Sequence, residues 1–102
     1  MNLVVWLQEW YQSQCNGDWE HSHGLTIKTI DNPGCSIEVN LKGTVLESKS
    51  FEKIYVDNDE FNEEKDEDWY TCFVHDGVFE GVAGPQHLGT IIEIFKKLAT
   101  EQ

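Results

Sequence analysis

One loop near the start of the chain holds most of the side chains that could do chemistry. Cys15, Asp18, His21 and His23 carry the sulfur, oxygen and nitrogen atoms that zinc prefers. Asp18 and Glu20 are a carboxylate pair, and the neighbouring histidines are of the type that acts as a general base. Cys15 and His21 could also form a nucleophile and its base. This loop therefore supports one hypothesis, a small metal-binding or hydrolytic protein.

The spacing of these residues argues against both kinds of chemistry. The pattern Cys-x5-His-x-His is not a standard zinc spacing, and no second Cys/His pair lies nearby in the sequence. The chain has no GxSxG motif, no phosphate-binding glycine-rich loop and no arginine to hold an anion. We therefore expect no catalytic activity, no bound metal and no cofactor, and exposed loop histidines are the simpler interpretation.

The same loop carries Trp19 between the acids Asp18 and Glu20. Tryptophan is favoured at the energetic centres of protein interfaces, so this ring could anchor a partner, with His21 beside it. It could instead fill the junction between the preceding helix and the following strand while Asp18 caps backbone amides. The sequence leaves both interpretations open. Asp18, Trp19, Glu20 and His21 are thus the first candidate partner-binding residues.

The composition limits the classes of protein to which this chain can belong. The 102 residues suffice for one domain, residues 1–102, and 39% of them are hydrophobic, which is enough to build a core. The three cysteines are an odd number at wide spacing, so we expect reduced thiols rather than a disulfide framework. No apolar run approaches the roughly 20 residues that span a membrane, and no secretory signal is recognisable. We therefore expect a cytoplasmic protein.

The chain is strongly acidic, with 19 Asp and Glu against 7 lysines and a formal net charge of −12. Such a charge repels nucleic-acid phosphates and anionic lipid, so neither is an expected partner. It favours a basic protein partner, although solubility alone is an equally simple explanation. Eight of the acids fall in residues 57–68 (DNDEFNEEKDED), which predict an exposed loop. This acidic stretch is the second candidate docking patch, formed by Asp57, Asp59, Glu60, Glu63, Glu64, Asp66 and Glu67.

Two stretches have the periodicity of amphipathic helices. The first covers residues 3–14 and follows Asn2, a plausible N-cap. The second begins at Pro85, which fits the first turn of a helix. The spacing i, i+3, i+4, i+7 defines their apolar faces, Leu3, Trp6, Leu7, Trp10 and Tyr11 in the first helix and Leu88, Ile91, Ile92, Phe95, Leu98 and Ala99 in the second.

Alternating apolar residues and turn signals between the helices predict strands. Aromatic Trp69 and the small Cys72 are expected to pack in the core from one of them. The order of elements predicts an α+β fold, a largely antiparallel four- to five-stranded sheet with an N-terminal and a C-terminal helix packed on it. The predicted strands are residues 25–30 and 35–41 around Asp31-Asn32-Pro33-Gly34, an irregular strand within 44–56, and residues 69–75 and 78–82 around Asp76-Gly77.

Several longer segments together resemble the immunity protein 53 family of bacterial polymorphic toxin systems. The segments are WLQEWYQSQCNGDWEHSHGLTIKTIDNPG, DEDWYTCFV and FEGVAGPQHL, and the similarity runs from Trp6 to about Leu98. The most specific pieces are W-x3-W-Y-x2-Q-C, the Gly17-Asp18-Trp19-Glu20-His21 run, Asp31-Asn32-Pro33-Gly34 and Gly84-Pro85. The chain departs from the family pattern at Asn16, which is often Asp, and at Cys35, where an aromatic is common.

The resemblance implies a small cytosolic protein that binds and inactivates a cognate toxin, without catalysis or a cofactor. Many toxin domains that attack nucleic acids are basic, so an acidic inhibitor could occupy the cleft meant for phosphate. The alternatives from other classes are the metal-binding or hydrolytic protein described above and a structural homodimer formed through apolar strand faces. A monomer and a homodimer are both compatible with the sequence.

Overall fold

The computed structural model describes residues 2–31, 33–57 and 69–100. In these ranges the chain forms a five-stranded antiparallel sheet with helices toward both ends of the sequence, which confirms the predicted α+β class. The elements in chain order are α1 (Leu3–Gln14), α2 (Trp19–Ser22), β1 (Leu25–Ile30), β2 (Gly34–Asn40), β3 (Ile54–Asp57), β4 (Trp69–His75), β5 (Val78–Ala83) and α3 (Leu88–Thr100).

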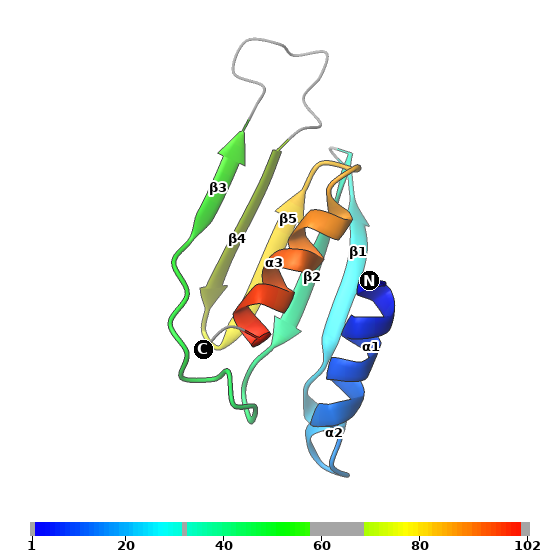
Figure 1. Ribbon diagram of the computed structural model, residues 1–102, viewed down its shortest axis with the longest axis vertical. Coiled ribbons are helices and arrows are strands. Elements are labelled where there is room, and N and C mark those ends of the chain that lie inside the picture. The colour runs from blue at the N-terminus through cyan, green and yellow to red at the C-terminus, as the bar shows by residue number, and fades with distance from the viewer. Residues whose placement is uncertain (1, 32, 58–68, 101–102) are drawn as a thin grey trace.

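The sheet consists of two hairpins, β1–β2 and β4–β5, which meet through β2 and β5, and of β3, which pairs with β4. The strand order is β1-β2-β5-β4-β3, and every neighbouring pair is antiparallel. Figure 1 shows α3 lying across the middle of the sheet, with α1 beside it along β1. Because β2 and β5 are central, each is paired on both sides, whereas β1 and β3 are the two edges.

Phe95 of α3 joins the two long helices to the sheet. Its ring centroid lies 5.2 Å from that of Phe79 in β5, 5.9 Å from that of Trp6 and 5.0 Å from that of Trp10. Phe95 and Phe79 are fully buried, and burial of such a side chain stabilises the fold by about 1.5–3 kcal/mol. Both helices therefore pack on the same side of the sheet. The helical periodicity predicted that Trp6, Trp10 and Phe95 lie on the apolar faces of these helices, and the side-chain oxygen of Asn2 caps α1 as expected.

The register of the sheet separates a helix-covered face from an uncovered one. Residues opposite each other in antiparallel strands share a face, and Ile37, Val39 and Phe79 are buried beneath the helices. Within the described part of the chain, no helix packs on the other side. We call that side the open face; it is formed by Thr26, Lys28, Ser36, Glu38, Asn40, Tyr55, Trp69, Thr71, Phe73, His75, Val78, Glu80 and Val82.

Trp69 belongs to this open face, so its predicted place in the core was wrong. The pleat sends adjacent residues to opposite faces, and in β4 the core side is taken by Tyr70, Cys72 and Val74. Trp69 is half-buried. The prediction for Cys72 is confirmed, because this residue is fully buried and burial raises the pKa of its thiol to about 12.

Residues 44–56 form less strand than predicted. Only β3, at the end of this stretch, is extended. Before it the chain turns repeatedly, since the amides of Thr44 and Glu47 donate to the carbonyls of Leu41 and Thr44. The hydroxyl of Thr44 also donates to the Leu41 carbonyl, 2.7 Å away, and accepts from the amide of Leu46. These local bonds replace the ladder that a strand would need.

The last helix also begins later than predicted. Pro85 lies in a turn in which the His87 amide donates to the carbonyl of Gly84, and α3 starts at Leu88. The hairpin at Asp76-Gly77 is confirmed, because His75 pairs directly with Val78 across a two-residue turn. Asp76 and Gly77 have φ values of 51° and 76°, as a type I′ turn requires.

Candidate interaction surfaces

The loop singled out by the sequence folds into a packed corner between α1 and β1. Its centre is Trp19, which is only 5% exposed and starts the short helix α2. The ring lies against Trp10 and Tyr11 of α1 and stacks on His23, with centroids 5.9–6.2 Å apart. Its indole N–H donates to the carbonyl of Lys42, 2.8 Å away. We call this cluster the Trp19 corner.

The burial of Trp19 fits the structural interpretation of this ring, in which it fills the junction between α1 and β1. An anchor for a partner must offer its surface in the free protein, and here α1, His23 and the loop after β2 enclose the ring. That loop can approach because Gly43 has a φ of 81° and no Cβ, which would lie 3.1 Å from the ring.

Glu20 and Asn16, rather than Asp18, satisfy the backbone of this loop. The Glu20 carboxylate accepts from the amides of Asn16 and Gly17, both at 2.9 Å. The Asn16 side chain accepts from the amides of Asp18 and Trp19. Asp18 makes no side-chain cap, so its predicted capping role was wrong. Hydrogen bonds from its own amide and from those of Asn16 and Gly17 lower the pKa of Glu20 below its ordinary value.

Asp18 and His21 are the exposed members of the predicted set. Both lie on the outer surface of the corner, where a partner can reach them. The side chains of Cys15, Asp18, His21 and His23 do not form a group that could hold a metal ion, nor does any other set in the described residues. The Cys15 thiol donates to the carbonyl of Tyr11, and within the described ranges no hydrogen bond joins it to His21. The corner thus does not assemble the predicted nucleophile and base.

Most of the acidic stretch falls outside the described residues. Asp59, Glu60, Glu63, Glu64, Asp66 and Glu67 all lie there, whereas Asp57 is the last residue of β3, paired with Trp69. The docking role of this stretch stays a prediction. The ends of β3 and β4 fix where it leaves and re-enters the fold, at one end of the sheet (Figure 1).

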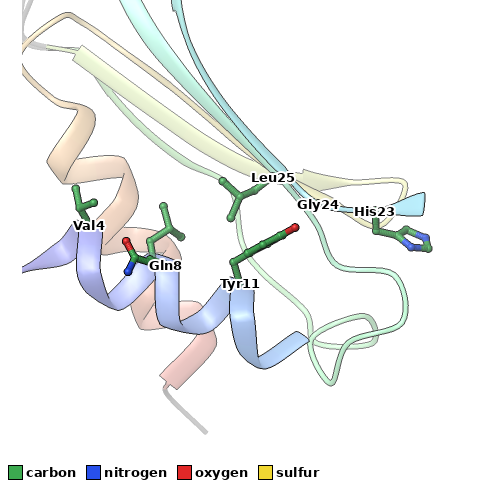
Figure 2. Close-up of a pocket in the computed structure, with 7 residues that line it drawn as sticks. Val4, Gln8, Tyr11, His23, Gly24 and Leu25 are labelled. Atoms are coloured by element: carbon green, nitrogen blue, oxygen red, sulfur yellow. The ribbon is translucent and has the colours of Figure 1, made fainter. Parts of the chain in front are cut away.

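An apolar groove of about 500 Å³ separates α1 from the start of β1. Figure 2 shows Val4, Gln8 and Tyr11 projecting from one side of α1, with Tyr11 extended toward Leu25. Val4 is 63% exposed, so the groove is open to solvent. The lining is completed by Leu7, His23 and Gly24.

The open face carries a feature of a different kind, two carboxylates side by side. Glu38 of β2 lies directly opposite Glu80 of β5 in the centre of the sheet. The same row ends at Phe73 of β4, and the Lys53 ammonium sits over the Phe73 ring, 5.7 Å from its centroid. Like charges directly opposite each other destabilise a sheet, so this pair costs the free protein stability.

The two carboxylates have unequal surroundings. His75 Nε2 lies 2.9 Å from a Glu80 oxygen, within hydrogen-bonding distance. Glu38 is half-buried, and among the described residues it has no hydrogen bond or ion pair. Lys28, on the same face, forms no ion pair with either acid in the described structure. The hydroxyl of Ser36, beside Glu38 on β2, is also buried without a partner.

A second, polar cavity connects the open face to the Trp19 corner. It measures about 380 Å³ and has Glu38, Asn40 and Val78 on the sheet side and Ser22 and His23 on the corner side. His23 lines this cavity as well as the apolar groove, and its Nδ1 atom is buried without a hydrogen-bond partner in the described residues. Exposed His21 directly precedes Ser22 in the chain, so it lies next to the corner end of this cavity.

Sequence reasoning missed Glu38, Glu80, Ser36 and His75 as candidate residues. Strand alternation already places Glu38 and Ser36 away from the core. What local sequence does not give is the pairing of β2 with β5, two strands far apart in the chain, which brings Glu38 and Glu80 together. A pattern search for charges on the polar face of each predicted strand could have found the individual acids.

The comparisons with known proteins give one finding. The family model of immunity protein 53 matches residues 4–100, nearly the whole chain. No match to a curated protein was found, and none to a solved structure. Among the described residues, none of the helices has the length and apolar character that crossing a membrane requires.

Proposed function

This chain belongs to the immunity protein 53 family, and we propose that it binds a cognate bacterial toxin and neutralises it by one-to-one association. The observation that carries this proposal is the family match over residues 4–100. The protein acts by occupying the toxin and needs neither a cofactor nor a catalytic step. It works in the cytoplasm of the producing cell, where the toxin would otherwise act.

The charge of the chain supports a basic toxin. At −12, the protein attracts a partner whose active cleft is positive because it binds nucleic-acid phosphates. Opposite charges raise the rate of encounter more than the final affinity. We propose that exposed Asp18 and His21, with Trp19 and Glu20 holding their loop in place, contact the toxin, and that the acidic stretch steers its approach.

The proposal is tested by capture followed by rescue. The tagged protein is used to capture partners from native cell lysate, the captured protein is identified by mass spectrometry, and its toxicity is measured on co-expression. We expect one basic toxin domain, with growth restored when the two proteins are expressed in equal amounts. A captured toxin that still stops growth at a large excess of this protein would refute neutralisation.

The steering role of the acidic stretch has its own measurement. Reversing the charges of Asp59, Glu60, Glu63 and Glu64 should slow association with the captured toxin. It should also flatten the salt dependence of the association rate, because it removes the attraction that salt screens. An on-rate at low salt equal to that of the wild type would remove the acidic stretch from the proposal.

A further inference from the structure

We propose that the open face is the surface on which this protein receives its partner, and that Glu38 and Glu80 together bind an arginine side chain of that partner. This inference rests on the proposed function for the identity of the partner, but it makes a claim of its own about chemistry. The claim is that the centre of the sheet is a guanidinium site. Four observations carry it.

The first observation is the placement of the two acids. Glu38 and Glu80 are direct cross-strand partners, and the Cβ atoms of such a pair lie about 4.5–5.5 Å apart. A planar guanidinium with five N–H donors can bridge two carboxylates at this separation, and arginine forms stronger, better oriented bonds of this type than lysine. The free protein holds the two acids together against their repulsion, which a bound cation would remove.

The second observation is that Glu38 has no cation beside it among the described residues. Its carboxylate is half-buried and has no hydrogen bond or ion pair in residues 2–31, 33–57 and 69–100. Among the described residues, Glu80 is paired with the imidazole of His75. Buried charges are normally paired, and we infer that a cation of another molecule pairs with Glu38.

The third observation is independent of charge. Ser36 is 4% exposed, and its hydroxyl has no hydrogen-bond partner among the described residues. It lies on the same strand and the same face as Glu38, two positions away, so it points to the same side of the sheet. A buried hydroxyl without a partner destabilises the protein. A guanidinium bound by Glu38 would lie on the same face of the sheet as this oxygen.

The fourth observation is the presence of aromatic side chains on the same face as the acids. Phe73 stands in the row of Glu80, and Trp69 and Tyr55 lie farther along β4 and β3 on the same face. Tyr55 is 62% exposed. Aromatic side chains are enriched at the centres of protein interfaces. At its other end, the face continues through the polar cavity to His23 and the Trp19 corner.

The same chemistry argues against a second copy of this chain on the open face. Two copies packed face to face would bring four carboxylates from Glu38 and Glu80 together without an arginine, since the chain has none. Each copy would also bring a net charge of −12. The occupant is therefore a basic protein.

The test compares two double variants that remove equal charge from different surfaces. Glu38→Gln with Glu80→Gln acts on the open face, and Glu9→Gln with Glu93→Gln acts on exposed helical positions. The probe is a tetra-arginine peptide amide titrated into the full chain, followed by amide chemical shifts. In the wild type we expect the largest shifts at residues 36–40 and 78–82. The Glu38/Glu80 variant should lose them while the Glu9/Glu93 variant keeps them. Equal loss in both variants, or largest shifts away from β2 and β5, would overturn the inference.

Affinity for the captured toxin domain separates this inference from the proposed function. We expect the dissociation constant to rise at least tenfold for the Glu38/Glu80 variant and by less than threefold for the Glu9/Glu93 variant. A toxin bound equally well by both variants would refute the guanidinium site and leave neutralisation intact. If the peptide titration maps to Glu38 and Glu80 but the protein neutralises no toxin, the guanidinium site is supported and the proposed function is refuted. Dimerisation of the wild type that the Glu38/Glu80 variant strengthens would also count against a basic occupant.

Discussion

The Trp19 corner and the open face are both built from polar and aromatic residues, but they differ in how those residues are satisfied. In the corner the indole N–H of Trp19 reaches a carbonyl and the carboxylate of Glu20 binds two amides. On the open face the carboxylate of Glu38 and the hydroxyl of Ser36 have no partner in the described structure. The corner therefore stabilises the fold, whereas the open face carries polar groups that could form hydrogen bonds with a partner.

His23 shares features of both regions. His23 belongs to the corner through its stacking on Trp19, yet its Nδ1 atom is buried without a partner among the described residues. It also lines the polar cavity that leads to Glu38. The two regions thus meet at His23. A change that loosens the corner is expected to disturb the adjacent end of the open face.

The largest expected effect is on stability, from Trp19→Ala. Loss of a buried tryptophan costs about 3–5 kcal/mol, and here it also removes the bond to the Lys42 carbonyl. The matched control is Trp69→Ala on the open face, which should cost less than half as much because Trp69 is half-buried. Urea unfolding measures both. Since Trp19→Ala could fail to fold, Trp19→Phe serves as a milder variant. Equal costs for the two alanine variants would remove the contrast between the regions.

Two hydroxyls of the open face should respond in opposite directions. Ser36→Ala is expected to raise the free energy of unfolding by about 1 kcal/mol, because it deletes a buried group without a partner. Thr71→Val should lower it by about 1 kcal/mol, because the Thr71 hydroxyl donates to the Ile54 carbonyl, 2.9 Å away. Thermal and urea unfolding decide the signs. A loss for Ser36→Ala would show that this hydroxyl already has a partner in the free protein.

Removing the repulsion between Glu38 and Glu80 should raise the free energy of unfolding by a smaller amount. The double glutamine variant is expected to gain about 0.2–1 kcal/mol, and the gain should shrink at high salt as the charges are screened. The Glu9→Gln, Glu93→Gln variant should stay near the wild type. Melting temperatures at low and high salt provide the measurement. A destabilised Glu38/Glu80 variant would mean that these acids support the free fold.

The smallest effect concerns the pH dependence of the corner. The folded-state pKa of Glu20 is lowered from 4.5, so its contribution to stability is present above that value and is lost as the pH falls through the folded-state pKa. Glu20→Gln should therefore be less stable than the wild type near neutral pH, with a gap that closes in acid. Glu9→Gln is the control. A gap that is constant from pH 3 to pH 7 would contradict the role assigned to the carboxylate.

The sequence predicted the elements that are set by local pattern. The spacing of Trp6, Leu7 and Trp10 gave α1, alternation gave β1 and β2, and Asp76-Gly77 gave the second hairpin. The failures came where short-range hydrogen bonds or the pleat decided the outcome. Thr44 folded its neighbours into turns, and the pleat turned the aromatic ring of Trp69 away from the core.

The candidate site was less predictable than the fold. The loop around Trp19 stood out because it is rich in functional groups, yet several of those groups serve the backbone and the core. The acids at the centre of the open face were unremarkable in sequence, since each is one polar residue in an alternating strand. Their pairing follows from the long-range contact of β2 with β5, which no local pattern encodes.

The most direct test of this account is the footprint of the captured toxin domain, in catalytically inactive form, on the amide spectrum of the full chain. At one equivalent we predict the largest shifts in residues 36–40 of β2 and 78–82 of β5, extending to His23 and the exposed Asp18 and His21. The spectrum should not change further beyond one equivalent. Largest shifts along α1 and α3, with β2 and β5 unchanged, would contradict the account.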